Sequence, residues 1–144
     1  MASDEAGGIV LDTSFLVAYH NEQDGHHVRA LEVMEGVTSG RWGAALLPEY
    51  VFLELTTVLA RRRDLAAAVS AGECLLAAEE LEFVPCSKLF LDAFDVFRGF
   101  PGSNPSFTDA AIVAIAQERK VDRVATFDRD FLRVEGLTVV PAPS

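Results

Sequence analysis

The segment GGIVLDTS, residues 7–14, predicts the first strand of the fold and places a carboxylate at its end. Its apolar run, Ile9–Leu11, is bounded by two glycines on one side and by Asp12 and two hydroxyl residues on the other. Short apolar runs with such boundaries are typical of buried central strands. Asp12 therefore follows directly on a strand that we expect to lie in the middle of a sheet.

Similar runs alternate with helical patterns along the rest of the chain. The predicted strands are 9–11, 42–47, 83–85, 123–126 and 137–140, and the predicted helices are 15–20, 26–38, 48–63, 65–81, 87–98, 106–120 and 128–132. This alternation predicts an α/β fold, a three-layer α/β/α sandwich with a central parallel sheet covered on both faces. The length of 144 residues fits a single domain, 1–144.

Four carboxylates occupy positions where a folded chain favours small or apolar residues. Asp12 and Asp128 follow predicted strands, Glu54 shares a helix face with apolar neighbours, and Asp109 lies in the first turn of a helix. Ligands of parallel sheets bind beyond the carboxyl ends of the strands, so we expect the four acids to converge there. Converging carboxylates repel one another unless a cation lies between them, and oxygen ligands suit Mg²⁺ or Mn²⁺. The pattern indicates metal-dependent phosphodiester chemistry.

Each acid also has a structural explanation. Asp12 is a good helix N-cap residue, although Thr13 or Ser14 would cap as well. Glu54 would be accounted for by a place at the edge of the apolar stripe, with its carboxylate in water. Asp109 completes a capping-box pattern that begins at Ser106. The hypothesis of a shared site therefore depends on the four acids together.

The last acid is ambiguous, because Asp128 and Asp130 are close together in FDRDF, residues 127–131. One of the two would serve the site, and the other would cap a helix or pair with an arginine. Asp128 is nearer the end of the strand and is our choice for the site. Thr126, two residues earlier, is placed to donate a hydrogen bond to an acid or to a substrate.

The formal net charge of −10 opposes nucleic-acid binding, which normally requires a basic surface. The positive charge is clustered, however, at Arg61–Arg63 and at Arg123, Arg129 and Arg133. The first cluster fits a favourable helix end as well as it fits a phosphate contact. Bound cations would also reverse the sign of the local field at the acids.

The remaining composition predicts an intracellular, cytoplasmic protein that does not enter membranes. No apolar run approaches the ~20 residues of a membrane span, and the acidic N-terminal sequence is unlike a signal peptide. The two cysteines, Cys74 and Cys86, match no zinc spacing and imply no disulfide.

With these residues in place, the chain resembles the PIN-domain nucleases, and especially the VapC-like toxins of toxin–antitoxin pairs. The matching segments are VLDTSFLVAY, EYVFLELTTVLARR, FTDAAIVAIA and VATFDRDF. The resemblance implies endoribonuclease activity that depends on Mg²⁺ or Mn²⁺, a homodimer, and an antitoxin that inserts a peptide into the active-site groove. It assigns the metal-binding and catalytic acids to Asp12, Glu54, Asp109 and Asp128, with Thr13 or Ser14 and Thr126 as polar neighbours.

Two other functions remain as alternatives. A phosphatase with an aspartate nucleophile needs a second acid two residues later, but Ser14 stands there. Hydrolysis of ATP or GTP is disfavoured because the sequence contains no G-x-x-x-x-G-K-[ST] loop. A non-catalytic regulatory module that keeps the fold and binds a protein partner is the second alternative.

Overall fold

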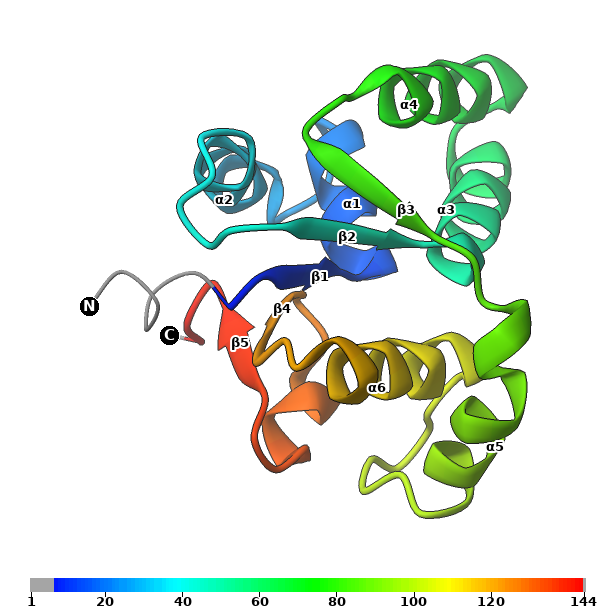
Figure 1. The fold of residues 1–144 in the computed structure, drawn as a ribbon. Helices are drawn as coiled ribbons and strands as arrows, with labels where there is room; N and C mark the ends of the chain where they lie inside the picture. Colours follow the sequence, from blue (N-terminus) through cyan, green and yellow to red (C-terminus); the bar gives the residue numbers. More distant parts are fainter. Residues whose placement is uncertain (1–6, 144) are drawn as a thin grey trace.

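The computed structural model describes residues 7–143, in which five parallel strands form one sheet between two layers of helices (Figure 1). The strands lie in the order β3-β2-β1-β4-β5, and every neighbouring pair is parallel. Their bounds are β1 (Ile9–Leu11), β2 (Ala45–Pro48), β3 (Leu81–Val84), β4 (Arg123–Ala125) and β5 (Thr138–Val140). The predicted three-layer α/β/α architecture is confirmed.

The helices divide between the two faces of the sheet. Their bounds are α1 (Thr13–His20), α2 (His27–Thr38), α3 (Glu49–Arg62), α4 (Leu65–Ala77), α5 (Phe90–Arg98) and α6 (Phe107–Arg119), with short 3-10 segments η2 (Ser87–Leu89) and η3 (Arg129–Arg133). Figure 1 shows α1 to α4 on one side of the sheet and α5 and α6 on the other. Within residues 7–143, no helix is long and apolar enough to cross a membrane.

The path of the chain reverses direction next to the first strand. From β1 it moves outward through β2 to β3, and it then returns across the sheet to β4 on the other side of β1. The connections that leave β1 and β4 therefore run to opposite faces. In open parallel sheets this divergence leaves a crevice beyond the carboxyl ends of the two strands, where ligands bind.

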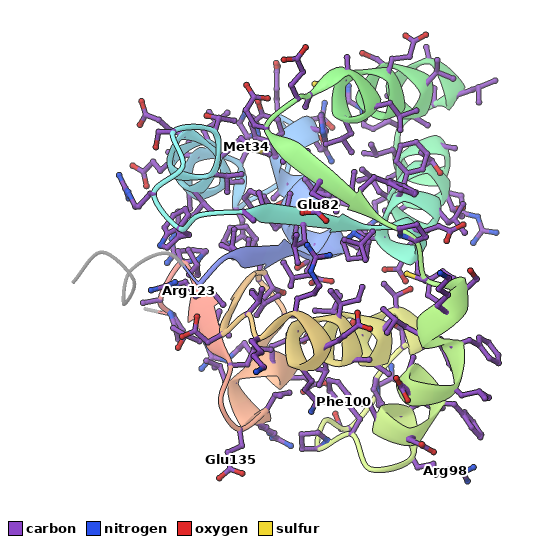
Figure 2. All side chains as sticks on the ribbon, viewed as in Figure 1. Met34, Glu82, Arg98, Phe100, Arg123 and Glu135 are labelled. Carbon is purple, nitrogen blue, oxygen red and sulfur yellow. The ribbon has the colours of Figure 1, made fainter. Side chains whose placement is uncertain are left out.

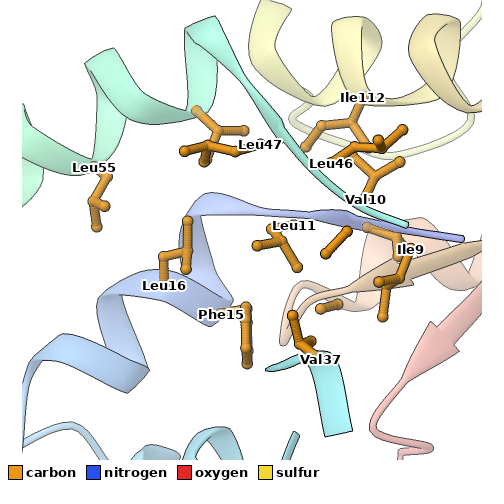
Figure 3. Packing of buried hydrophobic residues seen from close by; sticks show 14 of the residues in the cluster. Ile9, Val10, Leu11, Phe15, Leu16, Val37, Leu46, Leu47, Leu55 and Ile112 are labelled. Atoms are coloured by element: carbon orange, nitrogen blue, oxygen red, sulfur yellow. The ribbon is translucent and has the colours of Figure 1, made fainter. Parts of the chain in front are cut away.

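The core consists of alternating strand side chains packed against helices on both faces (Figure 3). Val10 and Leu46 point toward Ile112 of α6, whereas Ile9 points toward Val37 of α2. Helix α6 is buried almost all round from Asp109 to Ala116, as its apolar sequence predicts. Its first turn, which carries Asp109, is consequently fixed next to the sheet.

Two helices carry large apolar side chains on their exposed faces. In α2, Val28 is 69% exposed, and the buried residues are centred on Val33 and Met34. In α5, Leu91 is 73% exposed because the helix packs on α6 through the small side chain of Ala93. Periodicity alone cannot distinguish the two faces when both carry apolar residues.

Several element boundaries also differ from those predicted. Helix α4 ends at Ala77, β3 begins at Leu81, and the helix predicted over 87–98 is divided between η2 and α5. Pro48 ends β2 and precedes α3 as its N-cap residue, so it is not the first residue of the helix. Both cysteines are free, and Cys86 is buried.

Candidate active site

A cleft of about 650 Å³ lies beyond the carboxyl ends of β1 and β4, in the predicted crevice. All four predicted acids contribute to its wall. The lining consists of Asp12, Thr13, Ser14, Val17, Asp24, His26, Glu54, Val58, Arg62, Asn104, Ser106, Asp109, Phe127 and Asp128. The structure thus brings Asp12, Glu54, Asp109 and Asp128 to one place.

Asp12 is held by two hydroxyl groups from adjacent strand ends. Thr126 Oγ1 donates to Asp12 Oδ2 at 2.7 Å, and Ser14 Oγ donates to the same oxygen at 2.9 Å. Each hydroxyl in turn accepts a backbone N–H at 2.9 Å, Ser14 from Phe127 and Thr126 from Asp128. Because a hydroxyl carries one proton, these accepted bonds direct both protons toward Asp12.

Thr13 has a different place from its neighbour. Sequence reasoning left Thr13 and Ser14 as equal candidates for the polar neighbour of Asp12, and the structure gives that role to Ser14. The Oγ1 atom of Thr13 is buried beside the cleft and makes no hydrogen bond within the described part of the chain. A buried hydroxyl without a partner is costly, so this position favours a polar occupant in the cleft.

The pKa of Asp12 is raised to about 6, chiefly because burial penalises the charged carboxylate. The hydrogen bonds from Thr126 and Ser14 oppose this effect, since they stabilise the anion, and the charge of Asp128 adds to it. Asp12 is only 3% exposed. The two hydroxyls therefore stabilise the charge of Asp12 only in part, and no positively charged group is among the causes that lower its pKa.

Asp109 combines a capping role with an exceptional electrostatic environment. Its Oδ2 accepts the backbone N–H of Ser106 at 2.9 Å, and Ser106 Oγ accepts the backbone N–H of Asp109 at 3.1 Å, which completes the capping box. The pKa of Asp109 is nevertheless raised to about 7, first by burial and then by the charges of Asp12 and Asp128. The structural explanation for Asp109 is confirmed, and it coexists with strong repulsion from the other acids.

The structure distinguishes Asp128 from Asp130. Asp128 lines the cleft, whereas Asp130 does not. Asp128 Oδ1 also accepts the backbone N–H of Asp130 at 2.9 Å, as the N-cap of η3. The expectation that Asp130 provides the cap is therefore wrong: Asp128 is both the cap and the acid in the cleft.

Glu54 reaches the cleft from the middle of α3. Its helix neighbours Val51 and Leu55 are fully buried, while Glu54 and Val58 are partly exposed and line the cleft together. This position is the edge of the apolar stripe. The charge of Glu54 is not among those that raise the pKa of Asp12 or Asp109.

The acids are not arranged as a preformed metal-binding site. Across residues 7–143, no three His, Cys, Asp or Glu side chains lie close enough to hold a cation as they stand. Asp12, Asp109 and Asp128 are nevertheless within electrostatic reach of one another. Their repulsion and the unpaired hydroxyl of Thr13 fit a divalent cation, which would supply the missing positive charge and accept oxygen ligands.

The arginine clusters separate in three dimensions. Arg62 lines the cleft, whereas Arg61 lines a neighbouring pocket beside Tyr50. Arg63 has a structural role, because its Nη1 donates to Asn21 Oδ1 at 2.8 Å. Arg123 begins β4 and lies at the opposite end of the sheet (Figure 2).

Sequence reasoning did not identify three polar residues of the cleft wall. Asp24 and His26 come from the loop between α1 and α2, and Asn104 comes from the loop before α6. Asp24 Oδ1 accepts the backbone N–H of His26 at 2.8 Å, which fixes the loop in place. The sequence NEQDGHH, residues 21–27, has the composition of an ordinary polar turn, so it carries no signal for such a role.

Comparisons with known proteins agree with this geometry. The sequence pattern of the PIN domain family matches residues 9–137, and the chain therefore belongs to the PIN domain family. No curated protein sequence matches the chain.

Solved structures give the same fold. The chain is similar to VapC20 of Mycobacterium tuberculosis, a toxin that cleaves the sarcin–ricin loop, with 26% identity and a TM-score of 0.76 over 86% of this chain and 92% of that one. The VapBC2 complex of Rickettsia felis matches at 15% identity and a TM-score of 0.65, over 92% and 96%. FitAcB of Neisseria gonorrhoeae matches at 17% identity and a TM-score of 0.65, over 91% of this chain and 95% of that one. At these lower identities the likeness concerns the fold alone.

The raised pKa values predict that the metal-free protein loses stability as pH rises. Asp12 and Asp109 titrate near 6 and 7 in the folded chain but near 3.8 when unfolded, so their ionisation opposes folding. In EDTA, the free energy of unfolding should fall as the pH rises from about 4 to about 7. Each carboxylate should contribute about 1.4 kcal/mol for each factor of ten by which its proton affinity in the folded chain exceeds that in the unfolded chain. Urea unfolding at several pH values measures this.

The control is the double variant Asp12→Asn with Asp109→Asn, which retains hydrogen-bond acceptors but carries neither charge. Its stability should exceed that of the wild type at pH 8 and match it near pH 4. Burial lowers the pKa of His20 to about 4, which gives an opposite trend in this range, but that trend is common to both proteins and cancels in the difference. A variant that is less stable than the wild type at pH 8 would assign these acids to capping alone.

Proposed function

We propose that this chain is an endoribonuclease that cleaves RNA phosphodiester bonds with Mg²⁺ or Mn²⁺, and that it acts as the toxin of a toxin–antitoxin pair. The observation that carries the proposal is the group of three mutually repelling carboxylates, Asp12, Asp109 and Asp128, in one cleft. Membership of the PIN domain family and the similarity to VapC20, an RNA-cleaving toxin, support it.

We assign a role to each acid from its surroundings. Asp12 and Asp109, the most buried of the four, are the proposed direct ligands of the cation. Asp128 would complete the site or hold a second ion, and Glu54, which is partly exposed in the cleft wall, would orient the attacking water. When bound, the cation would lower the pKa of that water and neutralise charge on the phosphate. Ser14 and Thr126 keep Asp12 in one orientation, so the ligand oxygens are positioned before substrate arrives.

Arg62 supplies positive charge inside the cleft, although the net charge of −10 opposes nucleic-acid binding by the molecule as a whole. Its side chain lines the cleft beside the acids, where it is placed to contact a phosphate of the substrate. Bound cations would also offset the acids themselves. The local field that RNA meets in the cleft then differs from the field of the whole molecule.

Protein partners are the second part of the proposal. Apolar side chains are exposed on α3 and α5, where Leu53 and Phe90 are about half exposed, and on α4, where Leu65 and Leu76 are more so. Exposed apolar surfaces of this kind favour protein contacts. We assign them to a second copy of the chain and to an antitoxin, in keeping with a toxin–antitoxin complex of Klebsiella pneumoniae that shares the fold.

The decisive experiment combines cleavage with metal binding. Purified protein free of antitoxin should cleave single-stranded or structured RNA in Mg²⁺ or Mn²⁺ and should be inactive in EDTA. Metal at 100 times its Kd should raise the free energy of unfolding by about 2.7 kcal/mol. The variant Asp12→Asn with Asp109→Asn should lose both responses.

The alternatives give different results in the same assay. Metal-dependent stabilisation without cleavage of any RNA would favour the non-catalytic binding module. Release of phosphate from a phosphomonoester without RNA cleavage would favour a phosphatase.

Asp128→Asn should lower the cleavage rate roughly 10- to 100-fold, the effect typical of removing a residue that supports a metal site. Its melting temperature should stay near that of the wild type, because asparagine caps a helix as well as aspartate does. Asp130→Asn is the matched control two residues away, and it should keep the wild-type rate. The reverse ranking of the two rates would identify Asp130 as the fourth acid.

Arg62→Gln should weaken RNA binding and reduce its salt dependence, with the slope of log K against log salt falling by roughly 0.7 for one lost phosphate contact to a single strand. Arg61→Gln removes the same charge from the same helix end but outside the cleft, so its slope should equal that of the wild type. Fluorescence anisotropy over a range of salt concentrations measures both slopes. Equal slopes for the two variants would exclude a phosphate contact specific to Arg62.

A further inference from the structure

A smaller pocket of about 170 Å³ adjoins the catalytic cleft, and the two share His26, Phe127 and Asp128. The side chains that line it are apolar or basic for the most part. They include Arg29, Arg129, Leu132, Val139 and Pro141. An extended ligand that leaves the acidic cleft on this side would therefore pass His26 and Phe127 before it meets the two arginines.

His26 and Phe127 form a parallel aromatic stack at this boundary. Their ring centroids lie 4.3 Å apart, and the ring planes differ by 7°. Phe127 is half-buried, whereas His26 is exposed, so Phe127 supports a ring that remains accessible to solvent. The exposed ring of His26 is the outer layer of the stack and is available for a further planar group.

The backbone holds the stack in a fixed position. Phe127 donates its N–H to Ser14 Oγ at 2.9 Å, and His26 donates its N–H to Asp24 Oδ1 at 2.8 Å. The first bond belongs to the network that orients Asp12. The rings are thus coupled to the proposed metal site, and little conformational freedom would be lost when a ligand binds them.

Stability of the fold does not account for this arrangement. His26 precedes α2 as its N-cap residue, but its side chain makes no capping hydrogen bond. Its ring is exposed, so it contributes little to the core. An exposed histidine stacked at the edge of a cleft is therefore better explained by a ligand.

The charge beside the stack has the sign that nucleic acid requires. The guanidinium carbon of Arg29 lies 6.0 Å from the centroid of Phe127, and Arg29 Nη2 donates to the carbonyl of Ala142 at 2.7 Å, which holds the side chain over the pocket. Arg129 contributes a second positive charge to the pocket. Aromatic rings interleaved with arginines form the usual binding surface for single-stranded nucleic acid, in which bases stack and phosphates pair with cations.

We propose that the His26–Phe127 stack is the platform for the base of a nucleotide adjacent to the scissile phosphate of single-stranded RNA, and that Arg29 and Arg129 contact the phosphates beyond it. This inference rests on the proposed ribonuclease function. It adds a subsite that selects an unpaired, unstacked nucleotide next to the cleavage position. This subsite should prefer a single-stranded substrate, whose bases are free to stack on the platform, and it should favour bases that stack strongly.

The experiment measures steady-state cleavage of a 12-nucleotide single-stranded RNA in Mg²⁺ by the wild type, His26→Ala, His26→Phe and Val28→Ala. His26→Ala should raise KM roughly 5- to 150-fold, the effect of losing one base–aromatic stack. Its kcat should remain unchanged, because the ring does not act on the reacting atoms. His26→Phe should restore the wild-type KM. Val28→Ala is the matched control, an exposed residue in the first turn of α2, two positions after His26 and outside both pockets.

A second arm uses the same RNA with one abasic residue placed in turn at each position that flanks the cleavage site. At one position the missing base should raise KM for the wild type, and it should have no further effect on His26→Ala. This non-additivity identifies the base that stacks on the ring.

Three results would overturn the platform. Wild-type KM for His26→Ala would remove any role for the ring, while RNA cleavage by the wild type would leave the proposed function intact. Equal defects in His26→Phe and His26→Ala would assign the effect to the imidazole nitrogens in place of stacking. Failure of the wild type to cleave any RNA in Mg²⁺ or Mn²⁺ would overturn the proposed function and the platform with it.

Discussion

The hydrogen bond that Thr126 donates to Asp12 joins the carboxyl ends of β1 and β4, and Ser14 donates to the same carboxylate from the segment after β1. The rest of the site is arranged around these two bonds. The same hydroxyls accept the backbone N–H groups of Phe127 and Asp128. One network therefore sets the position of the first acid, of the fourth acid and of the aromatic residue between them. A change at either hydroxyl would disturb all three at once.

Electrostatic repulsion is the cost of this arrangement. Burial and mutual repulsion raise the pKa values of Asp12 and Asp109 above their ordinary range, and the surrounding hydrogen bonds offset only part of the effect. The protein thereby gives up stability to keep these charges together in the cleft, as is common where function requires charge in a low-dielectric environment. The capping box of Asp109 illustrates the same compromise, because a residue that stabilises α6 locally also repels its neighbours across the cleft.

The positive charge of the molecule is distributed according to separate needs. In the run Arg61–Arg63 only Arg62 lines the cleft, while Arg63 ties the end of α3 to Asn21 in the loop that leads toward His26. Arg29 and Arg129 line the adjoining pocket. A chain with a formal charge of −10 therefore keeps a few arginines next to the acids, where a polyanionic substrate would need them.

The sequence by itself determined the order of strands and helices, the parallel sheet and the four acids, because short buried strands, helix caps and costly charges are local signals. It could not determine the exposed face of α5, the capping role of Asp128 or the separation of Arg61 from Arg62. Those depend on which small side chains allow two helices to approach and on how a helix end is rotated. Nor did it indicate His26, whose stacking on Phe127 joins residues about a hundred positions apart. Contacts between distant segments have no local pattern, so only the tertiary structure decides them.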